Sequence, residues 1–231
     1  FSENTKNDSV KGIASFIKDS NKIYYGSLNM EDRKSIAISI LRCANIDKDE
    51  SFQTKLKTMA SNKFELQNSE IDLLFEDTTG DSLFEILKEK FLEGDLIQMF
   101  VYIWEQTLSK GEEEDDFEIE LIELTAEKFL LEKPTINETK KMGNERAKII
   151  RAISIIVKGD TAYNKLKAFE KTVLVALLLT ECSTIGGNIS LDDLKILKNI
   201  FSQQLNITSN ASAAVLEAKI EDSLTKKVEQ V

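Results

Sequence analysis

The sequence predicts an all-α protein, a multi-helix bundle of repeated helical hairpins with no significant β-sheet. Three observations support this fold class. Apolar residues recur with helical periodicity in nearly every long segment, and glycines fall between the segments. The 231 residues include only one proline and nine glycines, which is little turn chemistry for a sheet protein. Hydrophobic residues make up 42% and charged residues 30%, a composition typical of a globular chain with a core.

The first five predicted helices cover residues 30–43, 51–60, 71–75, 82–92 and 96–108. Asn29 is a suitable N-cap for the first, whose opening turn holds two acidic residues. The second carries large apolar residues at spacings of four and three, and the next two are shorter apolar pieces. The fifth is apolar on most sides, so its Phe100, Tyr102 and Trp104 are expected to lie in the core. The stretch 22–26 is a weak strand candidate with nothing to pair with.

The remaining predicted helices cover residues 116–131, 139–157, 161–182, 191–205 and 211–228. Pro134 is expected to stop the first of these, because proline cannot continue a helix. Glycines follow the second and third. Ser190 with Asp193 three residues later resembles a capping box before the fourth, and the last is amphipathic. Cys43 and Cys182 each lie in an apolar helical run and are expected to be small buried hydrophobes.

A helical hairpin pattern recurs along the chain. In each case an apolar helix leads into a short polar or acidic turn, and a second helix follows with large apolar residues at heptad-like spacing. The instances begin near residues 35, 97 and 173. If the hairpins share a fold, 35–60 and 97–124 should superpose, with Phe52 and Phe117 both buried.

The third turn, GGNISLDDLKILKNIF, resembles the Gly-x-Ile-(Ser/Asp)-x-(Glu/Asp)-Glu-Leu signature of the tellurite-resistance TerB-like superfamily. The matching residues are Gly187, Ile189, Ser190, Asp192, Asp193 and Leu194. The second turn fits through Gly111 and the acidic run behind it. This resemblance implies a helical domain of two such hairpins in a stress-response system, with cation sensing and partner docking, some of it near membranes. Lys110 and Gly186 replace the aspartate that usually precedes the turn glycine, which weakens the implied cation role.

Three regions follow from this interpretation. Residues 1–28 are an N-terminal helix and connector, residues 29–133 a TerB-like helical unit, and residues 134–231 the C-terminal helices with a further TerB-like hairpin. The regions are expected to pack as one body.

Several functional classes are disfavoured by composition. With no histidine, the chain cannot form Ser–His or Cys–His catalytic groups or imidazole metal sites. It has no phosphate-binding glycine loop or nucleophile elbow, so no catalytic residue is assigned and a non-enzymatic role is expected. The net charge of −10 argues against nucleic-acid binding. No apolar run reaches bilayer length and no signal-peptide pattern is present, so a cytoplasmic location is expected, with peripheral membrane association left open.

Charge is the most informative feature of the chain. Residues 70–132 carry twenty acidic and four basic side chains, whereas residues 140–171 carry nine basic and three acidic ones. Within the acidic part, Asp116, Glu120, Glu123 and Glu127 follow one another at spacings of four, three and four, which places them on one helix face. We call these four residues the acidic stripe.

Three interpretations of the acidic stripe are open. It is a solvated face, a docking face for a basic partner, or a cation site. The internal candidates for a basic counterpart are Arg146, Lys148 and Arg151. The candidate ligands for Ca²⁺ or Mg²⁺ are Glu112, Glu113, Asp115 and Asp116, and no other cofactor is expected. The favoured function is a TerB-like interaction or scaffold module with a protein partner. The alternatives are a helical-repeat adaptor for a partner peptide or helix, and a carboxylate-based enzyme.

Overall fold

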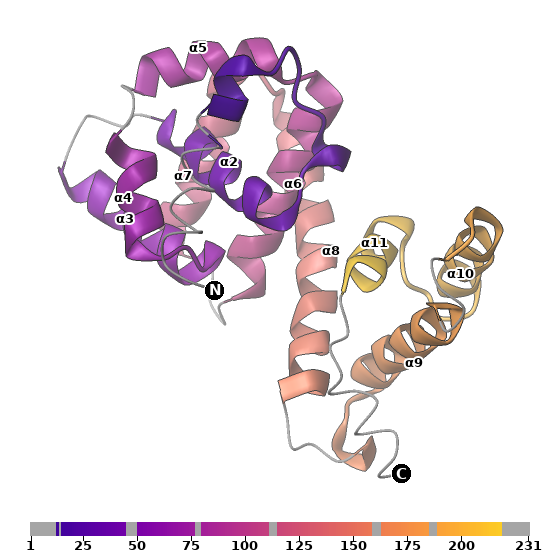
Figure 1. Ribbon diagram of the computed structural model, residues 1–231. Helices are drawn as coiled ribbons and strands as arrows, with labels where there is room; N and C mark the ends of the chain where they lie inside the picture. The colour runs from indigo at the N-terminus through magenta and orange to yellow at the C-terminus, as the bar shows by residue number, and fades with distance from the viewer. Residues whose placement is uncertain are drawn as a thin grey trace. The chain divides into compact units, whose positions relative to one another are not determined.

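The computed structural model describes residues 13, 15–44, 50–76, 80–110, 115–158, 163–184 and 189–218. Throughout these ranges the chain is built from helices and contains no named strand, which confirms the all-α class (Figure 1). The chain divides into two compact units, residues 1–143 and 144–231. The division falls inside α8 (Lys133–Lys158), so this helix contributes to both units. None of the described helices is both long and apolar enough to cross a membrane.

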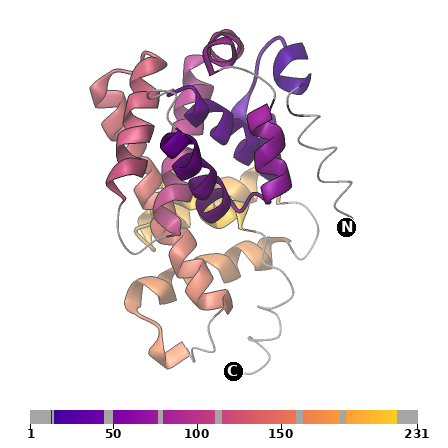
Figure 2. The ribbon, with the colours of Figure 1, turned by 90° about the vertical axis from the view of Figure 1, so that its left-hand side faces the viewer.

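The first unit is organised around α6 (Glu93–Ser109), which contacts α2, α3, α7 and η1 (Figures 1 and 2). The other elements of this unit are η1 (Tyr25–Ser27), α2 (Met30–Arg42), α3 (Glu50–Phe64), α4 (Asn68–Glu76), α5 (Gly80–Lys90) and α7 (Asp116–Lys128). As predicted, Phe100, Tyr102 and Trp104 of α6 are buried in the core. The Asn29 cap is confirmed as well, since its Oδ1 accepts a hydrogen bond from the Asp32 backbone N–H at 2.9 Å.

Residues 22–26 correct one expectation. The Ile23 backbone N–H donates to the Lys90 carbonyl at 2.9 Å, and Ile23 pairs with Phe91 in a single parallel bridge. The segment therefore has a backbone partner, but it forms no strand, because the chain turns at once into η1.

Pro134 corrects a second expectation. Helix α7 ends at Lys128, and Leu130 follows in the left-handed conformation with φ of 65°. Helix α8 then begins at Lys133, so Pro134 lies in its first turn rather than in the gap before a helix at 139. Proline is tolerated there because the first backbone N–H groups of a helix need no intrahelical acceptor.

Gly143 lies where α8 passes close to α6. A Cβ atom at this position would overlap the Cβ atom of Trp104 and would lie 2.9 Å from the Val101 carbonyl oxygen and 3.0 Å from the Glu105 backbone nitrogen. The absence of a side chain at residue 143 therefore allows this close approach.

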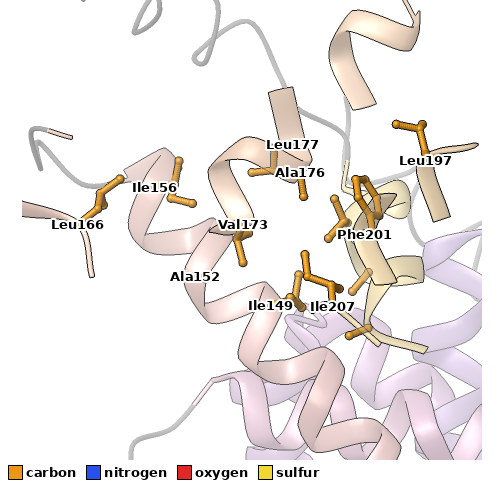
Figure 3. Packing of buried hydrophobic residues seen from close by; sticks show 13 residues of the cluster. Ile149, Ala152, Ile156, Leu166, Val173, Ala176, Leu177, Leu197, Phe201 and Ile207 are labelled. Atoms are coloured by element: carbon orange, nitrogen blue, oxygen red, sulfur yellow. The ribbon is translucent and has the colours of Figure 1, made fainter. Parts of the chain in front are cut away.

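The second unit contains the rest of α8, η2 (Tyr163–Lys165), α9 (Ala168–Thr184), α10 (Leu191–Gln203) and α11 (Ser209–Glu217). Helices α9, α10 and α11 contact one another in pairs. Their core holds Val173, Leu177 and Phe201, with Ile149 from α8 (Figure 3). The Ser190 cap is confirmed, because its Oγ accepts from the Asp193 backbone N–H at 3.1 Å. Helix α11 ends earlier than predicted, and the rest of the predicted helix, from residue 219, lies outside the described residues.

The two cysteines differ in exposure. Cys43 is fully buried at the end of α2, where its Sγ donates to the Ser39 carbonyl at 3.3 Å. Cys182 is exposed on α9, so the prediction that it is buried was wrong. The reason is that α9 is apolar on its solvent side as well as on its core side, and an apolar run alone does not tell the two sides apart.

Candidate functional site

The acidic stripe lies on the solvent side of α7. The helix starts at Asp116 because the Asp115 carboxylate accepts a hydrogen bond from the Phe117 backbone N–H at 2.8 Å and so caps it. Asp116, Glu120 and Glu127 are exposed and Glu123 is half-buried. The opposite side of α7 packs into the core through Leu121, Ile122, Thr125 and Ala126. The sequence-predicted spacing therefore does bring the four carboxylates onto one face.

Lys133 engages the C-terminal half of the acidic stripe, and sequence analysis missed it. Its Nζ lies 2.7 Å from Glu123 Oε2 and 3.9 Å from Glu127 Oε1. The hydrogen bond to Glu123 stabilises the charged ammonium and so raises the pKa of Lys133. Exposed pairs of this kind contribute little to stability. The contact shows instead that this surface accepts an ammonium group.

The predicted basic counterparts of the acidic stripe all belong to the second unit. Arg146 is buried, and its Nη2 lies 2.8 Å from Glu217 Oε2, which links α8 to α11. Lys148 is exposed and Arg151 is half-buried. Arg146 is therefore part of the packing of the second unit rather than an exposed docking residue.

The predicted cation ligands are only partly described. Glu112 and Glu113 lie outside the described residues. Asp115 and Asp116 are exposed, and the Asp115 carboxylate already caps α7. Among the residues that the structure describes, no three acidic or cysteine side chains are grouped so that they could hold a metal ion.

A hollow of about 570 Å³ lies between α3 and the start of α7. Its α3 wall runs from Thr54 to Lys63, and its α7 wall consists of Asp115, Phe117 and Glu118. The Lys55 Nζ lies 4.8 Å from the centroid of the Phe117 ring, within the range of a cation–π contact.

The rings of Phe52 and Phe117 meet edge to face, with centroids 6.1 Å apart. Both side chains are half-buried rather than fully buried as expected, since they pack against each other beside the hollow. The predicted superposition of the two hairpins stays a prediction.

An ion pair forms the inner wall of the hollow, and it too was missed. The Lys63 Nζ lies 3.3 Å from Glu118 Oε2, and the two side chains are only 12% and 10% exposed. Lys63 also donates to the Thr107 carbonyl at 3.3 Å. Burial raises the pKa of the Glu118 carboxyl, and this effect exceeds the lowering effect of the Lys63 charge.

The raised pKa of Glu118 predicts a pH-dependent contribution to stability. The native carboxyl holds its proton more tightly than the unfolded one, so the contribution is complete below the ordinary carboxyl pKa of 4.5 and is lost as the pH rises through the higher native pKa. We expect the difference in free energy of unfolding between the natural protein and Glu118→Gln to favour the natural protein more at pH ~4 than at pH ~7. Urea unfolding across this range measures the difference. A difference that is independent of pH would contradict the assignment.

Comparison of the chain with protein-family models, with curated proteins and with solved structures gave no match. The fold and the site define a two-unit helical protein whose first unit carries a row of four carboxylates, three of them exposed, along α7.

Proposed function

We propose that the protein is a non-enzymatic, TerB-like helical interaction or scaffold module. Its acidic stripe binds a lysine- and arginine-rich segment of a protein partner. The observation that carries the proposal is the ion pairing of Lys133 with Glu123 and Glu127. A lysine or arginine of a partner would make the same kind of contact with the acidic stripe. Glu120 and Asp116, one and two turns from Glu123 toward the start of α7, are exposed on the same helix face.

The electrostatics of the first unit support this choice of partner. Residues 1–143 carry thirty acidic and eighteen basic side chains, a net charge of −12. Like charges at helical spacings of three and four repel by a few tenths of a kcal/mol, so the acidic stripe does not stabilise α7 on its own. Complementary charge on a partner removes this repulsion, raises the association rate and fixes the orientation of the complex.

A binding measurement with matched variants tests the proposal. The probe is a fluorescently labelled lysine-rich peptide titrated with the full chain. Reversing the charges in Asp116→Lys/Glu120→Lys is expected to weaken binding about tenfold, because each change replaces an attraction of up to ~1 kcal/mol by a repulsion. The control is Glu85→Lys/Glu89→Lys, which makes the same change in net charge on an exposed face of α5 and is expected to retain most of the affinity.

Equal weakening by both double variants would mean that the peptide senses only the overall charge, which would contradict a docking face. Binding should also weaken as salt is added, since exposed charges are screened.

The same titration addresses the weak Ca²⁺ or Mg²⁺ binding that we propose for the acidic run before α7. A divalent salt at millimolar concentration should compete with the peptide more strongly than sodium chloride of equal ionic strength.

Carboxylate-based catalysis is the second candidate function, because Glu118 is buried, has a raised pKa and lines the hollow. We rank it second because the Lys63 ammonium is already paired with that carboxylate.

The resemblance to TerB-like proteins supports a cytoplasmic, stress-related role as part of the proposal. The same resemblance is the reason for considering a partner near a membrane.

A further inference from the structure

Helix α9 presents an apolar stripe to solvent on the side opposite its core residues. Lys171, Val175, Leu178 and Cys182 follow one another at spacings of four, three and four and so lie on one face. Val175 is 40% exposed, Cys182 is exposed, and Leu178 is partly exposed. The core side of the same helix packs through Val173, Ala176 and Leu177 (Figure 3). Helices that are apolar on all sides are normally covered on all sides.

Two charges that are not fully buried, Lys171 and Glu181, lie near the two ends of this stripe, Glu181 beside Cys182. Lys171 is near the start of the helix and Glu181 is near its last turn, with no charged residue between them. The third charge of α9, Glu170 in the first turn, is buried and accepts a hydrogen bond from the Lys167 backbone N–H at 2.7 Å, so it does not belong to the exposed face. A helix favours acidic groups at its start and basic groups at its end, so each of these charges is at the less favourable end of its own helix. An antiparallel helix laid along the stripe would reverse this relation and place each charge near the end that favours it.

We propose that the protein forms a symmetric dimer in which α9 pairs in an antiparallel orientation with α9 of a second copy. The two-fold axis passes between Val175 and Leu178, so that each Val175 packs against the partner's Leu178. Lys171 then lies beside the partner's Glu181, and two-fold symmetry makes this ion pair twice. The charge order selects this orientation, because a parallel pair would bring lysine to lysine and glutamate to glutamate.

Sedimentation of the full chain over a range of concentrations provides the first test. The natural protein is expected to approach twice its chain mass of 26.1 kDa as the concentration rises. Val175→Glu, which buries a charge at the centre of the interface, is expected to remain monomeric. The matched control is Ile196→Glu, since Ile196 is another exposed apolar residue of the second unit, on α10, and lies outside the proposed interface. A natural protein that stays monomeric, or equal effects of the two variants, would overturn the proposal.

Charge reversal provides the second test. Lys171→Glu and Glu181→Lys should each raise the dimer dissociation constant at least several-fold, because each creates two like-charge contacts, and the double variant should restore most of the affinity. Lys171 also lies 5.1 Å from the centroid of the Tyr163 ring, so its replacement removes a contact within the unit. The double variant lacks that contact too, so recovery would arise from the intersubunit pair. A double variant as weak as the single ones would contradict the ion pairs.

Cys182 reports the orientation of the helices. In the antiparallel register the two Cys182 residues are separated by roughly 17 Å along the helix axes, given 1.5 Å per residue. A disulfide needs Cα atoms within about 7 Å, so mild oxidation should not cross-link the native dimer through Cys182. Rapid formation of a Cys182–Cys182 disulfide in the native dimer would show parallel pairing and would overturn the antiparallel arrangement.

Discussion

Gly143→Ala is expected to destabilise the first unit by about 2–3 kcal/mol, although alanine is the better helix former. Alanine would gain about 1 kcal/mol of helix propensity. Its Cβ would, however, collide with Trp104 and crowd the Val101 carbonyl and the Glu105 backbone nitrogen. Backbone atoms cannot rotate away as a side chain can, so α8 and α6 would have to separate around the fully buried Trp104.

Urea unfolding of the full chain measures this effect. The matched control is Gly94→Ala in the first turn of α6, where a new Cβ would meet no atom within 4 Å. This control should leave stability unchanged or raise it slightly. If Gly143→Ala were as stable as the control, the close approach of the two helices would be incorrect.

Phe201→Ala is expected to destabilise the second unit by about 3–5 kcal/mol. The Phe201 ring is fully buried between α9, α11 and the second half of α8, and the helices around it cannot close the resulting cavity completely (Figure 3). Hydrogen exchange read by mass spectrometry should show faster exchange in α9, α10 and α11. Exchange in α2 and α6 should change little, because the cluster around Phe201 lies within residues 144–231.

Ser202→Ala is the control, since it changes the exposed neighbouring residue on the same helix. Protection that fell equally in α2 and α10 would show that the two units unfold together. Protection that did not fall at all would contradict the burial of Phe201.

The fold was predictable where its signals are local. The caps at Asn29 and Ser190 are hydrogen bonds between residues three positions apart in the sequence. The helical periodicity is likewise a spacing of three to four residues between apolar side chains. Pro134 was misinterpreted because the rule that proline ends a helix also allows it to begin one. Gly143 gave no signal, since only the three-dimensional position of α6 explains why a glycine is required in the middle of α8.

The same distinction holds for the candidate site. The acidic stripe was visible because its spacing is a property of a single helix. The ammonium of Lys133 reaches it only through the left-handed turn at Leu130, whose conformation a leucine does not predict. Lys63 and Glu118 are 55 residues apart in the sequence, and their pairing depends on the packing of α3 beside α7.

Because one thiol is buried and the other is exposed, thiol labelling can measure local opening of the protein without any substitution. At concentrations low enough to keep the chain monomeric, the exposed Cys182 can be modified directly by a thiol reagent, whereas Cys43 can react only when the end of α2 opens. In the regime of fast reclosing, the ratio of the Cys43 rate to that of a free thiol gives the free energy of this opening, with each tenfold of protection equal to about 1.4 kcal/mol. One labelling time course on the unaltered chain therefore follows a site in each unit separately.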